Sequence, residues 1–104
     1  MTVGRDATLY VGIARLELFV PDAHSLKEKR SHTRGLVQRL KARHTVLVTE
    51  VDHQDLHQRA ALAICALSTD ITDLESRLQR VRSTVDETWS GHVLSWDVQI
   101  TQEE

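Results

Sequence analysis

The sequence predicts a single α+β domain whose elements follow the order β-α-β-β-α-β. Two segments, residues 25–43 and 71–88, carry apolar residues at helical spacing. Four shorter segments, rich in β-branched and aliphatic residues, precede, separate and follow them. Right-handed crossovers then give a split-βαβ, ferredoxin-like fold. We expect an antiparallel four-stranded sheet in the order 4-1-3-2, with both helices on one face.

Length and composition fit one domain of this kind. The chain has 104 residues, of which 40% are hydrophobic and 27% are charged, and a second core would be too small to be stable. We expect residues 1–7 to form an N-terminal tail, residues 8–101 the domain and residues 102–104 a C-terminal tail. Cys65 is the only cysteine, which excludes an intrachain disulfide and fits a reducing cytoplasm. No apolar run approaches the length of a membrane span or a signal peptide, so we expect a cytoplasmic protein.

The first strand is predicted at residues 8–20 because two sets of residues alternate along it. The set expected to face the helices comprises Gly12, Ala14, Leu16, Leu18 and Val20. The other set mixes apolar and charged side chains, as expected of a half-covered face, and comprises Val11, Ile13, Arg15, Glu17 and Phe19.

The first helix is predicted at residues 25–43. Ser25 and Glu28 form an S-x-x-E capping box, and Pro21 stops any helix before it. At 100° per residue the apolar side chains form one stripe, which should face the core. This stripe comprises Leu26, Thr33, Leu36, Val37 and Leu40.

Most of the positive charge of the chain lies on this helix. Seven Lys or Arg residues and one acid fall between Lys27 and Arg43, whereas the rest of the chain is acidic and brings the total to −2. Lys29 lies on the apolar stripe and Arg30 beside it, and both oppose the helix dipole in the first turn. We therefore expect acids of this chain, or an anionic ligand, to compensate them. The pI is near 6.3, so the protein as a whole does not attract nucleic acid, and only a local basic patch could bind it.

The second half of the chain supplies a hairpin, a helix and a last strand. Residues 45–52 and 59–67 are apolar runs joined by the polar connection 53–57, which indicates a hairpin. Residues 68–70 can cap the second helix, whose apolar residues at helical spacing are Ile71, Leu74, Leu78, Val81 and Val85. Residues 92–101 form the last strand, in which Leu94, Trp96, Val98 and Ile100 alternate.

The pattern leaves open which face of the second and third strands meets the helices. Ion pairing of Lys29 with the second strand requires Val46 and Val48, not Leu47 and Val51, on the helix side. On the third strand both sets of alternate residues are apolar, so this strand leaves an exposed apolar patch whichever way it faces.

The predicted topology brings distant polar residues to one end of the molecule. The start of the first helix, the connection 53–57 and the loop 90–92 all lie there. The residues drawn together are His24, Lys27, Lys29, Arg30, Asp52, His53, Gln54, Asp55, His57, Arg59 and His92. This convergence is the main functional inference that the sequence allows.

Two segments at this end resemble a known protein family. SLKEKR at 25–30 and EVDHQDLHQRA at 50–60 are similar to the bacterial YlxP-like proteins, known as domain of unknown function 503. The resemblance covers roughly residues 9–100 and implies a ferredoxin-like fold. Genes of this family often lie beside those for a translation initiation factor and a ribosome-binding factor, which implies a translation-linked role. His57 stands where the family usually has an aromatic residue such as Trp, and the N-terminus is longer.

Two interpretations compete for the basic end. In the first, Lys29 and Arg30 pair with Glu50 and Asp52 in a structural ion network. In the second, cations that point away from the core bind the phosphates of RNA or of the ribosome. These cations form a row along one side of the helix, made of Lys27, Arg30, Arg34 and Lys41. The remaining polar residues are expected to cap one another in the hairpin, and they are His53, Gln54, Asp55, His57 and Arg59.

The sequence gives little support to catalysis or metal binding. His53 and His57 are four residues apart, but they lie in a predicted loop, so their spacing fixes no common face. No nucleophile elbow or Gly-rich phosphate loop is present. We expect no enzyme, no metal, no cofactor and no small-molecule substrate. The expected partner is RNA or the ribosome, without a membrane. The alternative is a self-associating structural module, a homodimer formed through the open face of the sheet.

Overall fold

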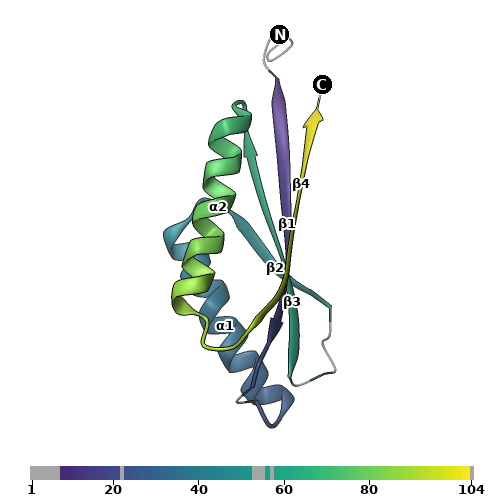
Figure 1. Ribbon diagram of the computed structural model, residues 1–104, viewed down its shortest axis with the longest axis vertical. Helices are drawn as coiled ribbons and strands as arrows, with labels where there is room; N and C mark the ends of the chain where they lie inside the picture. Colours follow the sequence, from purple (N-terminus) through teal and green to yellow (C-terminus); the bar gives the residue numbers. More distant parts are fainter. Residues whose placement is uncertain (1–7, 22, 53–55, 57, 104) are drawn as a thin grey trace.

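The computed structural model describes the chain except for residues 1–7, 22, 53–55, 57 and 104 (Figure 1). Its elements follow the predicted order, β-α-β-β-α-β. They are β1 (Leu9–Phe19), α1 (Leu26–Arg43), β2 (Leu47–Asp52), β3 (Arg59–Ser68), α2 (Ile71–Thr88) and β4 (Val93–Glu103). The sheet has the order β2-β3-β1-β4 with every neighbouring pair antiparallel, and both helices cover one face of it (Figure 1). The α+β, ferredoxin-like prediction is therefore confirmed.

The core lies between the two helices and the covered face of the sheet. Every second residue of β1 points into it, and α1 and α2 each contribute one stripe. The buried apolar residues of the strands are Ala14, Leu16, Leu18, Val48, Ala60, Leu62, Ile64 and Ala66. Those of the helices are Leu36, Leu40, Leu74, Leu78, Val81 and Val85. No helix among the described residues is long and apolar enough to cross a membrane.

The structure settles the faces of β2 and β3 that the sequence left open. Val48 is buried and Val46 is partly buried against the core, whereas Leu47 is 74% exposed. The helix-facing residues of β3 are Ala60, Leu62, Ile64 and Ala66. The opposite face carries the alternate set, Ala61, Ala63, Cys65 and Leu67, in register with the outward residues of β1.

Three residues of the apolar patterns, Ile71, Leu94 and Val98, are exposed. Ile71 is exposed. It is the first residue of α2 and lies at the end of the helix, beyond the buried stripe that begins at Leu74. Leu94 is exposed as well, because the register of β1 and β4 shifts between Glu17 and Leu18. This bulge places Val93, rather than Leu94, opposite Leu18.

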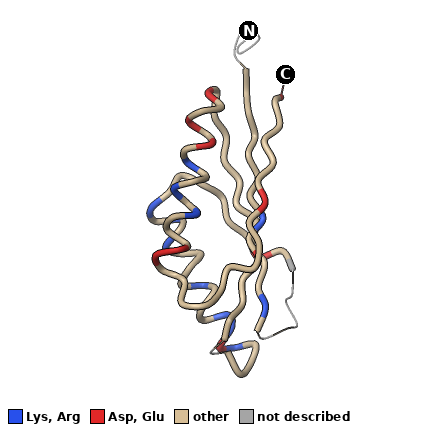
Figure 2. The backbone as a smooth tube through the Cα atoms, in the orientation of Figure 1, with Lys and Arg blue, Asp and Glu red and all other residues tan. Residues whose placement is uncertain are grey.

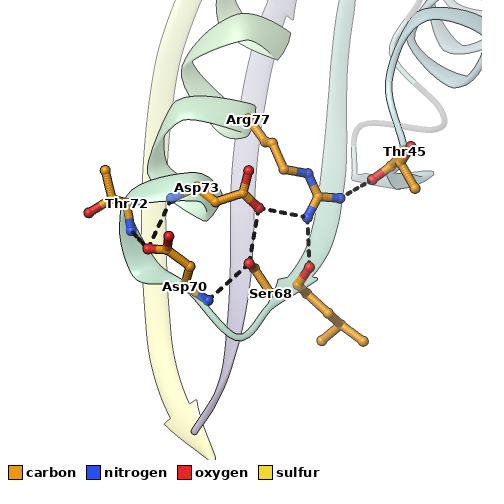
Figure 3. Close-up of polar contacts among 7 residues, drawn as sticks. Thr45, Ser68, Asp70, Thr72, Asp73 and Arg77 are labelled. Atoms are coloured by element: carbon orange, nitrogen blue, oxygen red, sulfur yellow. Dashed lines mark hydrogen bonds and ion pairs between the residues drawn. The ribbon is translucent and has the colours of Figure 1, made fainter. Parts of the chain in front are cut away.

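Arg77 ties α2 to the ends of two strands (Figure 3). Its Nη1 donates to the Leu67 carbonyl oxygen at 2.7 Å, and its Nη2 donates to the Thr45 carbonyl oxygen at 2.6 Å. The Asp73 carboxylate lies 3.7 Å from Nη1 and also accepts from the Ser68 hydroxyl. One guanidinium therefore holds the start of β2, the end of β3 and the first turns of α2 together.

Candidate functional site

The start of α1 is fixed by side-chain caps. The Ser25 hydroxyl oxygen accepts from the Glu28 amide at 3.2 Å, and the Glu28 carboxylate accepts from the His24 amide at 2.9 Å. The predicted capping box is thus present, but its carboxylate bonds the residue before the cap. These two bonds satisfy amides that the helix itself leaves free.

The segments predicted to converge do meet at this end of the sheet. The Val20 amide donates to the Gln58 carbonyl oxygen, and the Phe19 amide donates to the His92 carbonyl oxygen, both at 2.9 Å. The Trp89 indole Nε1 donates to the Phe19 carbonyl oxygen at 3.2 Å, and the Phe19 and His92 rings stack with centroids 6.2 Å apart. The predicted hairpin residues at positions 53–55 and 57 lie outside the described residues.

Lys29 is the buried charge of this end. Its side chain is 1% exposed, and its Nζ lies 3.6 Å from Oε1 of the partly exposed Glu50 on β2. Of the predicted ion network, the structure thus brings together Lys29 and Glu50. The described residues include no ion-pair partner for Arg30, which is exposed, and the side chain of Asp52 is not described.

A cleft of about 330 Å³ lies between α1 and β2 at this ion pair. Its lining comprises Lys29, Arg30, Thr33, Arg34, Val37 and Glu50. Thr33 is buried, and its hydroxyl donates to the Lys29 carbonyl oxygen at 3.0 Å. The two arginines are exposed. The lining therefore contains three cations and one carboxylate, an arrangement suited to an anionic group.

The predicted row of cations follows the same flank of α1. All four side chains are exposed, and they are Lys27, Arg30, Arg34 and Lys41. In the part of the chain that the structure describes, none of the four forms an ion pair, whereas on α2 Arg77 pairs with Asp73 and Arg82 with Asp86. Figure 2 shows basic residues along α1 and acidic ones at the start of α2. Hence α1 presents cations that no described acid neutralises.

The sheet separates other residues that were predicted to join this site. Arg59 lies opposite Phe19 in the register of β3 and β1, on the face away from the helices. Its Nη2 lies 3.7 Å from Oε2 of Glu17, an ion pair on that open face. The ring of His92 stacks on Phe19 there as well. Arg59 and His92 therefore share an end of the molecule with the cleft, but not a face.

Sequence patterns missed His44, which follows the last turn of α1. Its Nε2 lies 2.8 Å from the Thr84 hydroxyl of α2. Burial, with Arg80 and Arg43 nearby, lowers the pKa of the imidazole. The residues around His44 do not predict this contact, because Thr84 lies forty residues away in the sequence.

The described residues hold no group of three His, Cys, Asp or Glu side chains that could bind a metal ion. The polar atoms of the cleft are three cationic groups, a hydroxyl and one carboxylate. What this arrangement can do chemically is to hold an anion.

Comparisons with known proteins agree with the fold. A family model for proteins of unknown function, DUF503, matches residues 11–98. The uncharacterized protein YlxP of Bacillus subtilis (strain 168) is 36% identical over 76 residues, which are 73% of this chain and 83% of YlxP. The de novo designed protein Foldit4 is similar in fold alone, with a TM-score of 0.53 at 12% identity over 92% of this chain and 99% of its own. On the family match and the identity to YlxP, the chain belongs to the YlxP-like DUF503 family, whose function is unknown.

Proposed function

We propose that the protein is a small cytoplasmic binding module that holds RNA, free or within the ribosome, against the exposed flank of α1. The observation that carries the proposal is the row of four exposed cations without described acidic partners, Lys27, Arg30, Arg34 and Lys41. The row spans fourteen residue steps, or roughly 20 Å along the helix, which is long enough to meet several phosphates.

The cleft supports the same proposal. Arg30 and Arg34 belong both to the row and to the cleft, and a guanidinium can bond a phosphate through two parallel N–H groups. Lys29 below them is held by Glu50, so the exposed arginines make the direct contact. The translation-linked gene neighbourhood that the family resemblance implies is consistent with an RNA partner.

The test is a titration of ribosomal RNA at increasing salt. Four phosphate contacts predict a log–log slope of affinity against salt of about −3. Lys27→Glu with Arg34→Glu should weaken binding at low salt by about tenfold or more and reduce the slope by about 1.5. Both residues are exposed, so circular dichroism should show an unchanged fold.

The matched control is Arg39→Glu with Arg80→Glu. It changes the net charge by the same amount, but Arg39 lies beside the end of α2, on the other flank of α1, and Arg80 lies on α2. We expect this variant to bind nearly as well as the parent. Equal losses of RNA affinity in the two double variants would show that net charge, and not the row on α1, determines binding. Absence of RNA binding by the parent at low salt would refute the proposal.

An alternative candidate function is self-association through the open face of the sheet. The observation that favours it is a cluster of exposed apolar side chains there, with Leu47 74%, Leu67 54% and Ile13 42% exposed. These residues lie on adjacent strands in register with Cys65 and Val11. The charged and polar residues of β4 adjoin this cluster on the same face, so the apolar area is confined to β2, β3 and part of β1.

Light scattering tests this second function. Ile13→Lys should convert a dimer formed through this face into a monomer, because it places a charge within the apolar cluster. A dimer that persists in this variant would exclude the open face as the interface.

A further inference from the structure

β4 forms an edge of the sheet that no described segment covers. It lies at the end of the strand order, and among the described strands its partner is β1 (Figure 1). The strand is eleven residues long, VLSWDVQITQE, and it contains no Pro, Lys or Arg. Natural sheets use such residues, short strands or bulges to prevent pairing at an edge. The bulge of β4 lies near its start at Leu94, so Ser95–Glu103 keeps a regular register with β1.

The helix-facing side of β4 is apolar and incompletely covered. Trp96 and Ile100 are partly buried, and Val98 between them is 43% exposed. A groove of about 630 Å³ separates these three residues from α2, whose Leu78 also lines it. Arg82 reaches over Trp96, with its Cζ 5.8 Å from the ring centroid. An apolar face beside an unpaired backbone edge is the surface to which another strand can add.

We propose that β4 pairs antiparallel with β4 of a second copy of this chain, about a two-fold axis through Val98. In such a pair, residues equally distant from Val98 lie opposite each other. The strand is self-complementary in this register. Trp96 faces Ile100 of the second copy on the apolar side, and Asp97 faces Gln99 on the polar side. The two sheets become one continuous sheet of eight strands.

The charges of β4 disfavour two other registers, and an axis through Gln99 would place Trp96 opposite Gln102 instead of Ile100. Asp97 lies opposite Arg15 of its own chain, and the axis at Val98 adds no second carboxylate opposite it. An axis through Asp97 would oppose two carboxylates directly. An axis through Ile100 would place Asp97 opposite Glu103, and like charges in opposed positions destabilise a strand pair.

This pairing is independent of the proposed RNA contact. The cleft and the cationic flank of α1 lie beside β2, at the other edge of the sheet. A dimer through β4 therefore leaves both α1 flanks accessible, and failure of one proposal says nothing about the other. The pairing is an alternative to association through the open face, because it uses the backbone edge of β4, and the two interfaces predict opposite results for Ile13→Lys.

The first experiment compares two lysine substitutions by light scattering of the full chain at high concentration and moderate salt. Val98→Lys places two ammonium groups on the axis, whereas Ile13→Lys places the same charge at a strand position of nearly equal exposure, 42% against 43%. We expect the parent and Ile13→Lys to be dimers and Val98→Lys to be a monomer. A monomeric parent, or a dimer that Ile13→Lys alone dissociates, would overturn the proposal.

The second experiment tests the register by crosslinking and does not depend on the stability of the lysine variants. Opposed residues of antiparallel strands have Cα atoms about 4.5–5.5 Å apart, within the range of about 4.4–6.8 Å that a disulfide spans. In a Cys65→Ser background, Val98→Cys should form a disulfide-linked dimer under mild oxidation. Leu47→Cys, on the opposite edge strand and 74% exposed, should not. A crosslink through position 47 alone, or none at position 98, would contradict the pairing.

Discussion

Lys29 carries a charge at a position where α1 packs against the sheet. Its ammonium is almost completely buried beside Glu50, and removing an ion from water requires compensation by its partners. The two partners are unequal, because Glu50 keeps part of its surface in solvent. The loss of the acid and the loss of the base should therefore have different effects.

We predict that Glu50→Ala destabilises the fold more than Lys29→Met. Glu50→Ala removes a partner from a buried ammonium and should cost about 2–3 kcal/mol, less than for a fully buried pair because the carboxylate is partly solvated. Lys29→Met removes the buried charge and keeps the length of the side chain, so its effect should stay within about 1 kcal/mol. Urea unfolding measures both, and the reverse order would contradict the assignment.

His44 should make stability depend on pH. Its pKa is lowered in the fold by burial, by Arg80 and by Arg43, so the unfolded chain binds a proton more readily. The contribution of neutral His44 to the free energy of unfolding is fully present above the unfolded pKa of about 6.5. It is lost as the pH falls from there through the lowered folded pKa. Urea unfolding of the parent and of His44→Gln between neutral and mildly acidic pH should show a smaller loss in the variant. Parallel profiles would exclude His44 as the cause.

At the scale of the elements, Arg77 determines how α2 meets the ends of β2 and β3. Arg77→Met removes two short hydrogen bonds to main-chain oxygens and should cost about 2–3 kcal/mol. The control is Arg82→Met, because the ion-pair partner of Arg82 among the described residues is Asp86 of the same helix, and its guanidinium lies over Trp96. It should cost about 1 kcal/mol or less. Denaturant unfolding compares the two, and equal losses would show that the strand-end contacts add nothing.

Two glycines should respond oppositely to alanine. A Cβ at Gly91 would lie 2.1 Å from the Phe19 carbonyl oxygen and 2.9 Å from Trp89 Nε1, so Gly91→Ala should separate the loop from β1 and cost about 1–3 kcal/mol. Gly35 lies in α1 with open space around it, and Gly35→Ala should stabilise the helix by up to about 1 kcal/mol. Thermal unfolding measures both changes. A stabilised Gly91→Ala variant would contradict this packing.

At the scale of the whole molecule, periodicity predicted every element, because helices and strands repeat with different periods, and right-handed crossovers then predicted the strand order. It did not predict the face of β3, where residues on both sides are apolar. It also did not predict that Leu94 leaves the alternation, since a bulge shifts the register by one residue and no residue pattern indicates it. Arg77 was missed because its acceptors are main-chain oxygens, which are the same in every residue type.

The candidate site was predictable only in part, because the sequence pattern does not determine the face of the sheet on which each polar residue lies. The position of Lys29 on an apolar stripe indicated a buried ammonium, and the structure places it beside Glu50. Topology indicated which end of the molecule other polar residues reach, but not which face of the sheet they occupy. Arg59 therefore lies away from the cleft, on the open face.

The position of β1 between β3 and β4 affects how the chain folds while it is being made. Of the four strands described in this sheet, β1 is synthesised first and β4 last. At about 5–20 residues per second, the start of β4 follows the end of β1 by about 4–15 s. Throughout that interval the side of β1 that will pair with β4 has no partner strand. The sheet is therefore complete only once β4 has been made, and until then β1 is an edge strand that other chains can reach.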